Sequence, residues 1–394
     1  MDGIGARVRA VRKAKGLTLE AVAGLAGISR SALWAYETGD RDLHRMNTID
    51  ALAEALSVSR AWLLGQPDSP DTAAGSAAYA HAERIRLALV RCELGTGTVE
   101  PRPLALCVEQ ADRAHDTHLA GDVIGAARIV PDVLTDLHTW ATTGTEEEQL
   151  AASRAFVIAC AAACSTAKWL GFLDLSWTAA VLGRQAAART DDPVHVGLAD
   201  FYASHALAPY ADALANTLAA VGRLQPHVGD NLSAMQVYGM LHQMAAFGAA
   251  VVGRTDDVAA HLGEAEDLAR RTGDRTDFGL FFGPTNLGIW RVSIAVEQGE
   301  GGRAAEIARK IDIRPMPSAG RHANFYMDLG RGFAQEHRDE QALNAFLTAE
   351  RFSPERTARN PLVRSATEQI INRATRSAVS SPLRAFAHRM GALP

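Results

Sequence analysis

The chain is poor in cysteine and in aromatic residues for its length. Only 4 of its 394 residues are cysteine, and Phe, Trp and Tyr together make up 6% of it. Cys92, Cys107, Cys160 and Cys164 lack the Cys-x2-Cys spacing that zinc and redox sites use. A disulfide-stabilised secreted fold is therefore not expected, and this cysteine usage suits a reducing compartment.

Long hydrophobic runs and catalytic motifs are also missing. No apolar run approaches the length of a membrane span, and the N-terminus lacks the apolar region of a signal peptide. The chain contains no Gly-x-Ser-x-Gly, Walker loop, His-Glu-x-x-His or helix-opening Gly-x-Gly-x-x-Gly. His115, His118 and Asp122 have metal-ligand spacing, but Gly121 is expected to break that helix. We predict a cytoplasmic protein that is not an enzyme, holds no metal or cofactor and contacts no membrane.

Strand signals are nearly absent, whereas apolar residues recur at spacings of three and four over most of the chain. This periodicity predicts an all-α protein. The length, with 47% hydrophobic and 22% charged residues, supports two or more compact domains.

Residues 17–39 have the pattern of two short helices joined by a tight turn. Thr18 and Ser29 are suitable N-caps for the two helices, and Gly27 can adopt the positive φ that ends the first. Ala23 is small enough to let the helices cross closely, and Leu33 faces inward. The segment is therefore predicted to be a helix-turn-helix.

The flanking segments extend this pattern to five helices. Together they resemble the lambda-repressor-like, or xenobiotic-response-element (XRE), family of helix-turn-helix domains. Residues 8–18 are similar to the first helix of that family and its Gly-Leu-Thr exit, and 36–41 follow its third helix. Residues 52–59 and 62–65 are similar to the fourth and fifth helices. The resemblance implies a five-helix DNA-binding domain over residues 1–66.

The resemblance also implies which side chains meet DNA. Those expected at base edges in the major groove are Ser29, Arg30, Ser31 and Trp34, and those expected at phosphates are Thr18, Arg41 and Arg45. Arg12 and Glu37 resemble a structural ion pair between the first and third helices of the family. Glu20 and Trp34 depart from the family pattern. A carboxylate such as that of Glu20 is unhelpful near phosphate, and the family usually has a small polar residue at the position of Trp34.

The charge of this segment is weakly basic. Residues 1–66 hold nine Lys and Arg against seven Asp and Glu, whereas the remainder of the chain holds 31 against 38. The positive sign of this net charge suits a DNA-binding domain. Its small magnitude implies that one copy binds DNA weakly and that a homodimer binds a two-fold operator. The alternative is a degenerate helix-turn-helix that serves as a protein-interaction module.

Residues beyond the first domain indicate paired helices. A Pro-, Gly- and Ser-containing stretch predicts a linker over 67–82. Short turns at 171, 253, 299 and 336 each precede an Ala-rich helix, at intervals of 82, 46 and 37 residues. That period is typical of tetratricopeptide-like (TPR-like) hairpins, so residues 83–394 are predicted to form a TPR-like α-solenoid. An irregular helical domain is the alternative.

A solenoid of this kind exposes a concave face lined by the first helix of each pair. These first helices are predicted at 196–210, 233–251, 284–298 and 321–335. Polar side chains recur on them near the repeat period, with aromatic residues beside them. The candidate ligand-binding residues are His205, Tyr238, Gln243, Phe282, Asn286 and Asn324. The alternative is that this ladder is a coincidence and that the aromatics belong to the core.

The segment 281–286, Phe-Phe-Gly-Pro-Thr-Asn, is a second candidate for ligand binding. Pro284 suits the first turn of a helix, and the positive end of that helix can hold a carboxylate or lactone oxygen. Equally, Gly-Pro can simply begin a helix.

The whole layout resembles two-domain bacterial regulators, of an actinobacterial type, with an N-terminal DNA reader and a helical-repeat sensor. It implies a nucleoid-associated transcriptional regulator that binds a double-stranded operator as a homodimer and responds to a small-molecule or peptide effector. The alternative is a DNA-binding regulator whose repeats bind a protein partner and no small ligand. The operator, the sign of regulation and the effector do not follow from the sequence.

Overall fold

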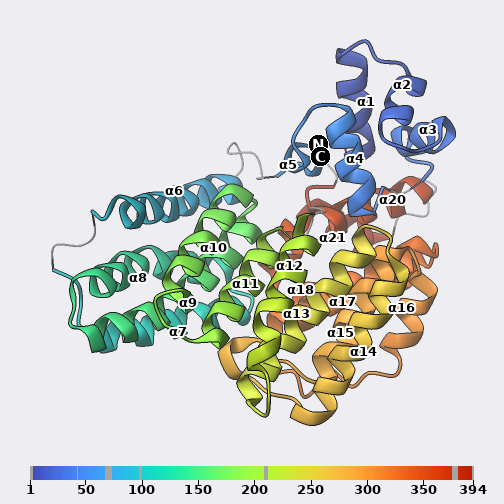
Figure 1. The fold of residues 1–394 in the computed structure, drawn as a ribbon. Helices are drawn as coiled ribbons and strands as arrows, with labels where there is room; N and C mark the ends of the chain where they lie inside the picture. Colours follow the sequence, from blue (N-terminus) through green and yellow to red (C-terminus); the bar gives the residue numbers. More distant parts are fainter. Residues whose placement is uncertain are drawn as a thin grey trace.

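The computed structural model describes residues 3–41, 43–66, 73–96, 100–207, 212–374 and 380–392. Within these ranges every regular element is a helix, as the periodicity predicted. The helices form a small N-terminal bundle and a large array of helical hairpins (Figure 1).

The N-terminal bundle consists of five short helices. They are α1 (Ile4–Ala14), α2 (Leu19–Leu25), α3 (Arg30–Thr38), α4 (Met46–Ala55) and α5 (Arg60–Leu64). One apolar side chain or more from each helix enters a common core, among them Val8, Val22, Leu33, Ile49 and Leu63, each fully buried. The expected five-helix domain is therefore present.

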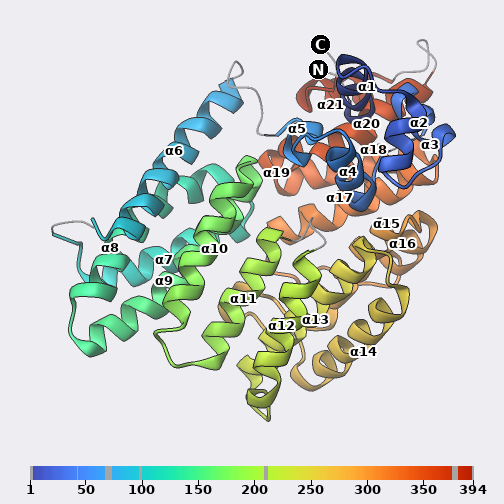
Figure 2. The same cartoon turned by 45° about the horizontal axis from the view of Figure 1, so that its top comes forward.

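Six antiparallel hairpins follow along the chain. They pair α7 (Leu104–Leu119) with α8 (Val123–Thr143), α9 (Glu146–Leu170) with α10 (Leu173–Ala187), α11 (Pro193–Leu207) with α12 (Asp212–Leu224), α13 (Leu232–Val251) with α14 (Thr255–Thr272), α15 (Pro284–Gln298) with α16 (Gly301–Ala308), and α17 (Ala319–Gln335) with α18 (Asp339–Phe352). Each first helix also packs on the next one, so the hairpins follow one another in an arc (Figure 2). The fold is consistent with the predicted helical solenoid.

The turns of these hairpins explain why glycines in the sequence predicted where the helices end. Gly171, Gly253 and Gly299 have φ of 91°, 77° and 78°, a conformation that side chains with a Cβ rarely adopt. Each lies between the two helices of a hairpin, where the first helix must stop. Because these glycines mark the end of each first helix, they also indicated where each second helix begins.

A further helix precedes the first hairpin and occupies part of the predicted linker. α6 (Ala73–Leu94) begins within residues 67–82, so 73–82 are helical, while 67–72 lie outside the described residues. Ala78, Ala82, Ile85 and Leu89 are buried at spacings of four, three and four, and α6 packs on α8 and α10. The Pro, Gly and Ser residues of this stretch predicted a linker, but Ala78 and Ala82 form part of a buried helix face there.

The C-terminal helices close the arc against its beginning. α19 (Pro354–Arg359) follows the last hairpin and precedes α20 (Pro361–Arg373) and α21 (Ser381–Arg389). The hydroxyl of Ser318 donates to the carbonyl of Leu119 at 2.7 Å, and that of Ser353 donates to the carbonyl of Gly121 at 2.8 Å. The carboxylate of Glu355 accepts from two backbone amides at the start of α8, each at 3.1 Å. The array is thereby held as a closed superhelix.

The longest described helix of this array is α9. By length and composition it is the one described helix apolar enough to cross a membrane, but 78% of its apolar window is buried inside the protein. Small residues such as Cys160 and Cys164 lie on its packed face, and both are buried free thiols. Its hydrophobicity is accounted for by packing against α8 and α10.

Candidate DNA-binding interface and ligand cavity

The local chemistry of the helix-turn-helix is as the sequence predicted. The side chain of Thr18 accepts from the amide of Ala21 at 3.1 Å and caps α2, and that of Ser29 accepts from the amide of Ala32 at 3.1 Å and caps α3. Gly27, with φ of 66°, lies between the two helices. These caps fix the angle at which α3 leaves the turn.

One face of α3 is buried and the other is open to solvent. Leu33 is fully buried and Glu37 is 7% exposed. On the other side lie four exposed residues, namely Ser29, Arg30, Ser31 and Trp34. The structure therefore brings together the four residues expected at base edges, and Trp34, with 51% of its surface exposed, does not serve the core.

Arg30 is engaged by an acidic neighbour. Its guanidinium forms an ion pair with the carboxylate of Glu20 on α2, and both side chains are more than 60% exposed. The pair lies on the surface that would face DNA, so a phosphate or base would compete with Glu20 for Arg30. This contact explains how the unusual Glu20 is accommodated.

The residues expected at phosphates divide into two groups. Thr18 and Arg41 are exposed, and the Arg41 guanidinium lies over the ring of Tyr36, 5.5 Å from its centroid. Arg45 is exposed as well, but it donates to the carbonyl of Gln298 at the end of α15. In this structure Arg45 therefore contacts the repeat domain, which we define as helices α6 to α21.

The predicted ion pair between α1 and α3 is present. Arg12 donates from Nε to Oε1 of Glu37 at 2.6 Å and from Nη2 to Oε2 at 2.7 Å. This hydrogen bonding, opposed by burial, raises the pKa of the Arg12 guanidinium. Nearby, a Cβ on Gly5 would lie 1.9 Å from the carbonyl oxygen of Tyr36, so α1 and α3 are in close backbone contact.

The helix-turn-helix domain docks on the repeat domain through the start of α4. Met46 is buried there, and the guanidinium of Arg331 on α17 donates to the carbonyl of His44 at 3.4 Å. Val251, at the end of α13, is buried in the core of the N-terminal domain. Both ribbon views show the blue N-terminal helices beside the red C-terminal helices α20 and α21 (Figures 1 and 2).

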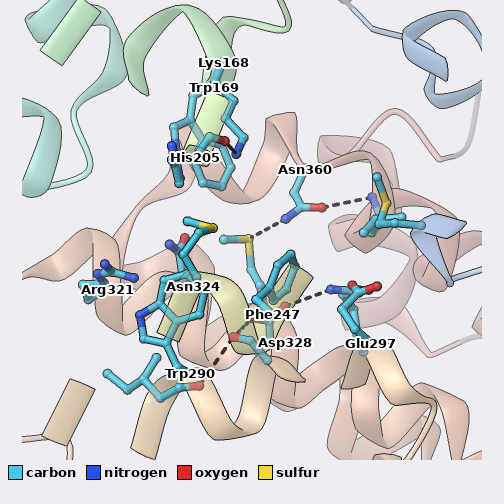
Figure 3. A pocket seen from close by; sticks show the side chains of 17 residues that line it. Lys168, Trp169, His205, Phe247, Trp290, Glu297, Arg321, Asn324, Asp328 and Asn360 are labelled. Atoms are coloured by element: carbon cyan, nitrogen blue, oxygen red, sulfur yellow. Dashed lines mark hydrogen bonds and ion pairs between the residues drawn. The ribbon is translucent and has the colours of Figure 1, made fainter. Parts of the chain in front are cut away.

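A cavity of about 250 Å³ lies where the two domains meet (Figure 3). Its walls come mainly from the first helices of the hairpins, with Met46 contributed by the N-terminal domain. The lining residues are Met46, Lys168, Trp169, His205, Met244, Phe247, Ile289, Trp290, Ser293, Glu297, Arg321, Asn324, Met327, Asp328, Arg331, Asn360 and Leu362. Its size is close to the lower limit of small-molecule sites.

The acidic groups of the cavity are neutralised within the protein. Arg331 donates to Glu297 at 2.8 Å and to Asp328 at 2.9 Å, and the hydroxyl of Ser293 donates to Asp328 at 2.5 Å. Lys168 instead donates from Nζ to the carbonyl of His205 at 2.6 Å. Burial lowers the pKa of Lys168 to about 8 and holds the pKa of the His205 imidazole well below its usual value, so His205 is neutral at pH 7.

The six predicted ligand residues do not share one site. His205 and Asn324 line the cavity. Phe282 is fully buried and packs so tightly on Gly239 that a Cβ there would lie 2.1 Å from its ring. The remaining three are Tyr238, whose ring packs on His242, and the fully buried Gln243 and Asn286, none of which lines the cavity.

Asn286 shows how the predicted ladder missed the cavity. It lies one turn before Trp290 on the same face of α15, and its amide donates to the carbonyl of Leu280 at 3.3 Å. The recurring polar residue lies on the helix face that lines the cavity, but the repeat period did not give the turn at which the cavity begins. The cavity begins about one turn later, at Ile289 and Trp290.

The N-terminus of α15 already holds a carboxylate of the protein itself. Asp274 accepts from the amide of Thr285 at 3.1 Å and from its hydroxyl at 2.7 Å. Arg291, the basic residue nearby, forms an ion pair with Glu266 at 2.9 Å. The segment 281–286 thus begins a helix, and in this structure its N-terminal groups bind an internal acid.

Sequence reasoning missed Lys168, Trp169, Trp290 and Arg321 as lining residues. A signal was present, because Trp290, Ser293 and Glu297 recur at three and four residues along α15, as Asn324, Asp328 and Arg331 do along α17. The two histidines with metal-ligand spacing have other partners, since His115 contacts the hydroxyl of Tyr202 and His118 contacts Arg356. Among the residues described, no group of three or more His, Cys, Asp or Glu is arranged to hold a metal ion.

The comparison with protein families agrees with the first domain. A family model described as a helix-turn-helix domain matches residues 4–63. A search of curated proteins and a search of solved structures each returned no match. The N-terminal domain is therefore a helix-turn-helix domain, and its presence supports a role for the protein as a DNA-binding regulator.

Proposed function

We propose that the protein is a sequence-specific DNA-binding transcriptional regulator of the cytoplasm, whose repeat domain pairs two copies and senses a small molecule. One observation carries the DNA-binding part. The residues Ser29, Arg30, Ser31 and Trp34 share the solvent-facing side of a capped helix whose other side is buried. A helix presented in this way can enter the major groove with its N-terminal residues at base edges.

The experiment is selection of bound fragments from genomic DNA by the full-length protein. Enrichment of one sequence motif is expected for the wild type. Arg30→Ala should weaken binding to that motif by roughly 1–3 kcal/mol and relax the preference at one base position. Arg309→Ala, at an exposed position after α16, is the matched control and should bind as the wild type does.

Failure to enrich any motif would contradict sequence-specific binding. It would favour instead the use of this domain as a protein-interaction module. A mixture of unrelated fragments, bound with equal affinity by wild type and Arg30→Ala, would point to nonspecific phosphate contact alone.

Pairing of two copies is proposed because a single weakly basic domain binds DNA poorly. The exposed side of α6 supports a surface for it. Leu87, Val90 and Leu94 are 47%, 47% and 68% exposed at spacings of three and four, as in the seam between two packed helices. A second copy of the chain is the partner to which we assign this stripe.

Light scattering of the purified protein tests the pairing. The wild type is expected to have twice the mass of the chain, and Val90→Asp half of that value. Leu232→Asp places the same charge at another exposed leucine, at the start of α13, and should leave the mass unchanged. A monomeric wild type at micromolar concentration would overturn this part of the proposal.

The sensing role is supported by the cavity between the two domains. A cavity of small-molecule size favours a small effector over a folded protein partner. Purification of the protein from its native host distinguishes a small effector from a protein partner. A protein that co-purifies in stoichiometric amount would support control by that partner instead.

A further inference from the structure

The cavity between the two domains contains two cations without an acidic partner. In the part of the chain that the structure describes, Lys168 donates only to the carbonyl of His205, and Arg321 forms no ion pair. The guanidinium of Arg321 lies instead over the ring of Trp290, 5.7 Å from its centroid. The two carboxylates in the lining, Glu297 and Asp328, are both bound by Arg331. The lining thus carries an excess of positive charge.

The surroundings of Arg321 add to this excess. Burial lowers the pKa of the nearby Arg356 guanidinium to about 9, and the charge of Arg321 contributes to this shift. Burial lowers the pKa of Arg321 too, opposed by the phenol of Tyr202. Placing these cations together without an acid costs free energy, which an anion in the cavity would offset.

Polar atoms in the same walls also lack partners. Nε1 of Trp290, Oδ1 of Asn324 and Nδ1 of His205 are buried without a hydrogen bond. The donor Nε1 of Trp290 in particular can donate to an anionic ligand in the cavity, because a buried polar group without a partner gains free energy when it is hydrogen-bonded. Two further hydrogen-bonding groups, the side chains of Lys168 and Arg321, line the same space (Figure 3).

Much of the remaining lining is apolar. The rings of Trp169, Phe247 and Trp290 and the side chains of Met244 and Met327 surround the polar groups. Lys168, Trp169 and His205 lie across the cavity from Asn324, Trp290 and Arg321 (Figure 3). A ligand that fills this space therefore presents an apolar, preferably aromatic body together with an anionic group.

We propose that this cavity binds a small organic anion with an apolar body, held by Lys168 and Arg321, and that its binding stabilises the docked position of the helix-turn-helix domain. The proposal rests on the sensing role proposed above and names its ligand class. The coupling follows from Met46, which belongs to α4 and forms part of the cavity wall. A ligand that touches Met46 binds the docked arrangement more tightly than an undocked one, and so favours it.

The test uses anilinonaphthalene sulfonate as the probe, because it joins an aromatic body to one anionic group and fluoresces when bound. Its neutral analogue, N-phenylnaphthylamine, lacks the sulfonate. The full-length wild type is expected to bind the anionic probe at one site and at least about tenfold more tightly than the neutral one, as expected for a charge-assisted hydrogen bond.

Two substitutions should remove this preference. Arg321→Met and Lys168→Met are expected to weaken binding of the sulfonate by about tenfold or more, with little change for the neutral analogue. Arg321→Lys retains the charge and should keep most of the preference, which separates loss of charge from loss of packing. Arg309→Met is the exposed control. Circular dichroism of each variant identifies any that fails to fold.

A separate variant tests the coupling between ligand binding and docking of the helix-turn-helix domain. Met46→Ala removes the contribution of α4 to the wall and should weaken binding of both probes several-fold. Equal binding of the two probes by the wild type, or an unchanged preference in Arg321→Met and Lys168→Met, would overturn the proposed ligand class. Unchanged binding by Met46→Ala would overturn the coupling. None of these measurements involves DNA, so failure here is distinct from failure to recognise an operator.

Discussion

Arg12 and Glu37 join the first and third helices through two hydrogen bonds of 2.6 and 2.7 Å. The side chains are 12% and 3% exposed, so the pair is largely shielded from water. Arg12 also donates to the carbonyl of Leu17 at 2.9 Å, which ties the exit of α1 to the same contact. The position of α3 relative to α1 therefore depends on this pair.

Loss of the Glu37 carboxylate should destabilise the N-terminal domain. Glu37→Gln keeps the shape of the side chain but leaves the Arg12 guanidinium without its counter-charge, at an expected cost of about 3 kcal/mol. Hydrogen exchange of the amides of α1 and α3 measures this locally, without requiring that the whole chain unfold in one step. Protection equal to that of the wild type would show that packing alone holds the two helices.

The exposed pair of Glu20 and Arg30 should behave differently. Glu20→Gln is expected to leave hydrogen exchange unchanged, because a solvent-exposed ion pair contributes little to stability. It should increase affinity for DNA about threefold or more at low salt, since it frees Arg30 and removes a carboxylate near phosphate. Titration of labelled operator at two salt concentrations measures this. Weaker binding by the variant would mean that Glu20 orients Arg30 for its contact.

The N-terminal domain could be predicted in detail because its information is local. The caps Thr18 and Ser29 and the turn residue Gly27 lie within a dozen residues of one another, and each was placed correctly. The hairpins of the repeat domain were predicted for a similar reason, since Gly171, Gly253 and Gly299 mark turns whatever the rest of the chain does.

The cavity could not be predicted in the same way. Lys168, His205, Trp290 and Arg321 come from four different helices and meet only because the superhelix closes on itself and the first domain covers it. Closure depends on contacts such as that of Ser353 with the carbonyl of Gly121, which span most of the chain. A helix-face pattern gives the direction of a side chain but not the turn at which the neighbouring helix departs.

The packing of Phe282 gives a test of the repeat core. Gly239→Ala would place a methyl group 2.1 Å from the fully buried ring, and the expected destabilisation is about 1–3 kcal/mol. Gly263→Ala is the matched control, because that glycine lies within α14 with nothing within 4 Å of a Cβ. It should stabilise the protein by about 0.5–1 kcal/mol. Urea unfolding followed by circular dichroism compares the two, and equal effects would contradict the tight contact.

Lys168 makes the stability of the repeat domain depend on pH. Its pKa is lowered from 10.5 to about 8, chiefly by burial and further by Arg60 of the first domain, while Cys164 opposes this. His205 faces it from α11 and is neutral, and Arg321 on α17 adds positive charge to the same cavity.

Below pH 8 the ammonium is charged in both the folded and the unfolded chain, so the cost of burying it is present in full. Between about pH 8 and 10.5 the unfolded chain binds this proton more tightly than the folded chain does, and the free energy of unfolding should rise with pH. The buried thiols, including Cys164 with its pKa raised to about 11, act in the opposite sense above pH 9.

The informative quantity is therefore the difference in the free energy of unfolding between wild type and Lys168→Met, measured by urea unfolding at pH 7 and pH 9. The variant should be the more stable at pH 7, and its advantage should shrink at pH 9. An advantage that is independent of pH would mean that Lys168 is not buried as a charged group in the folded protein.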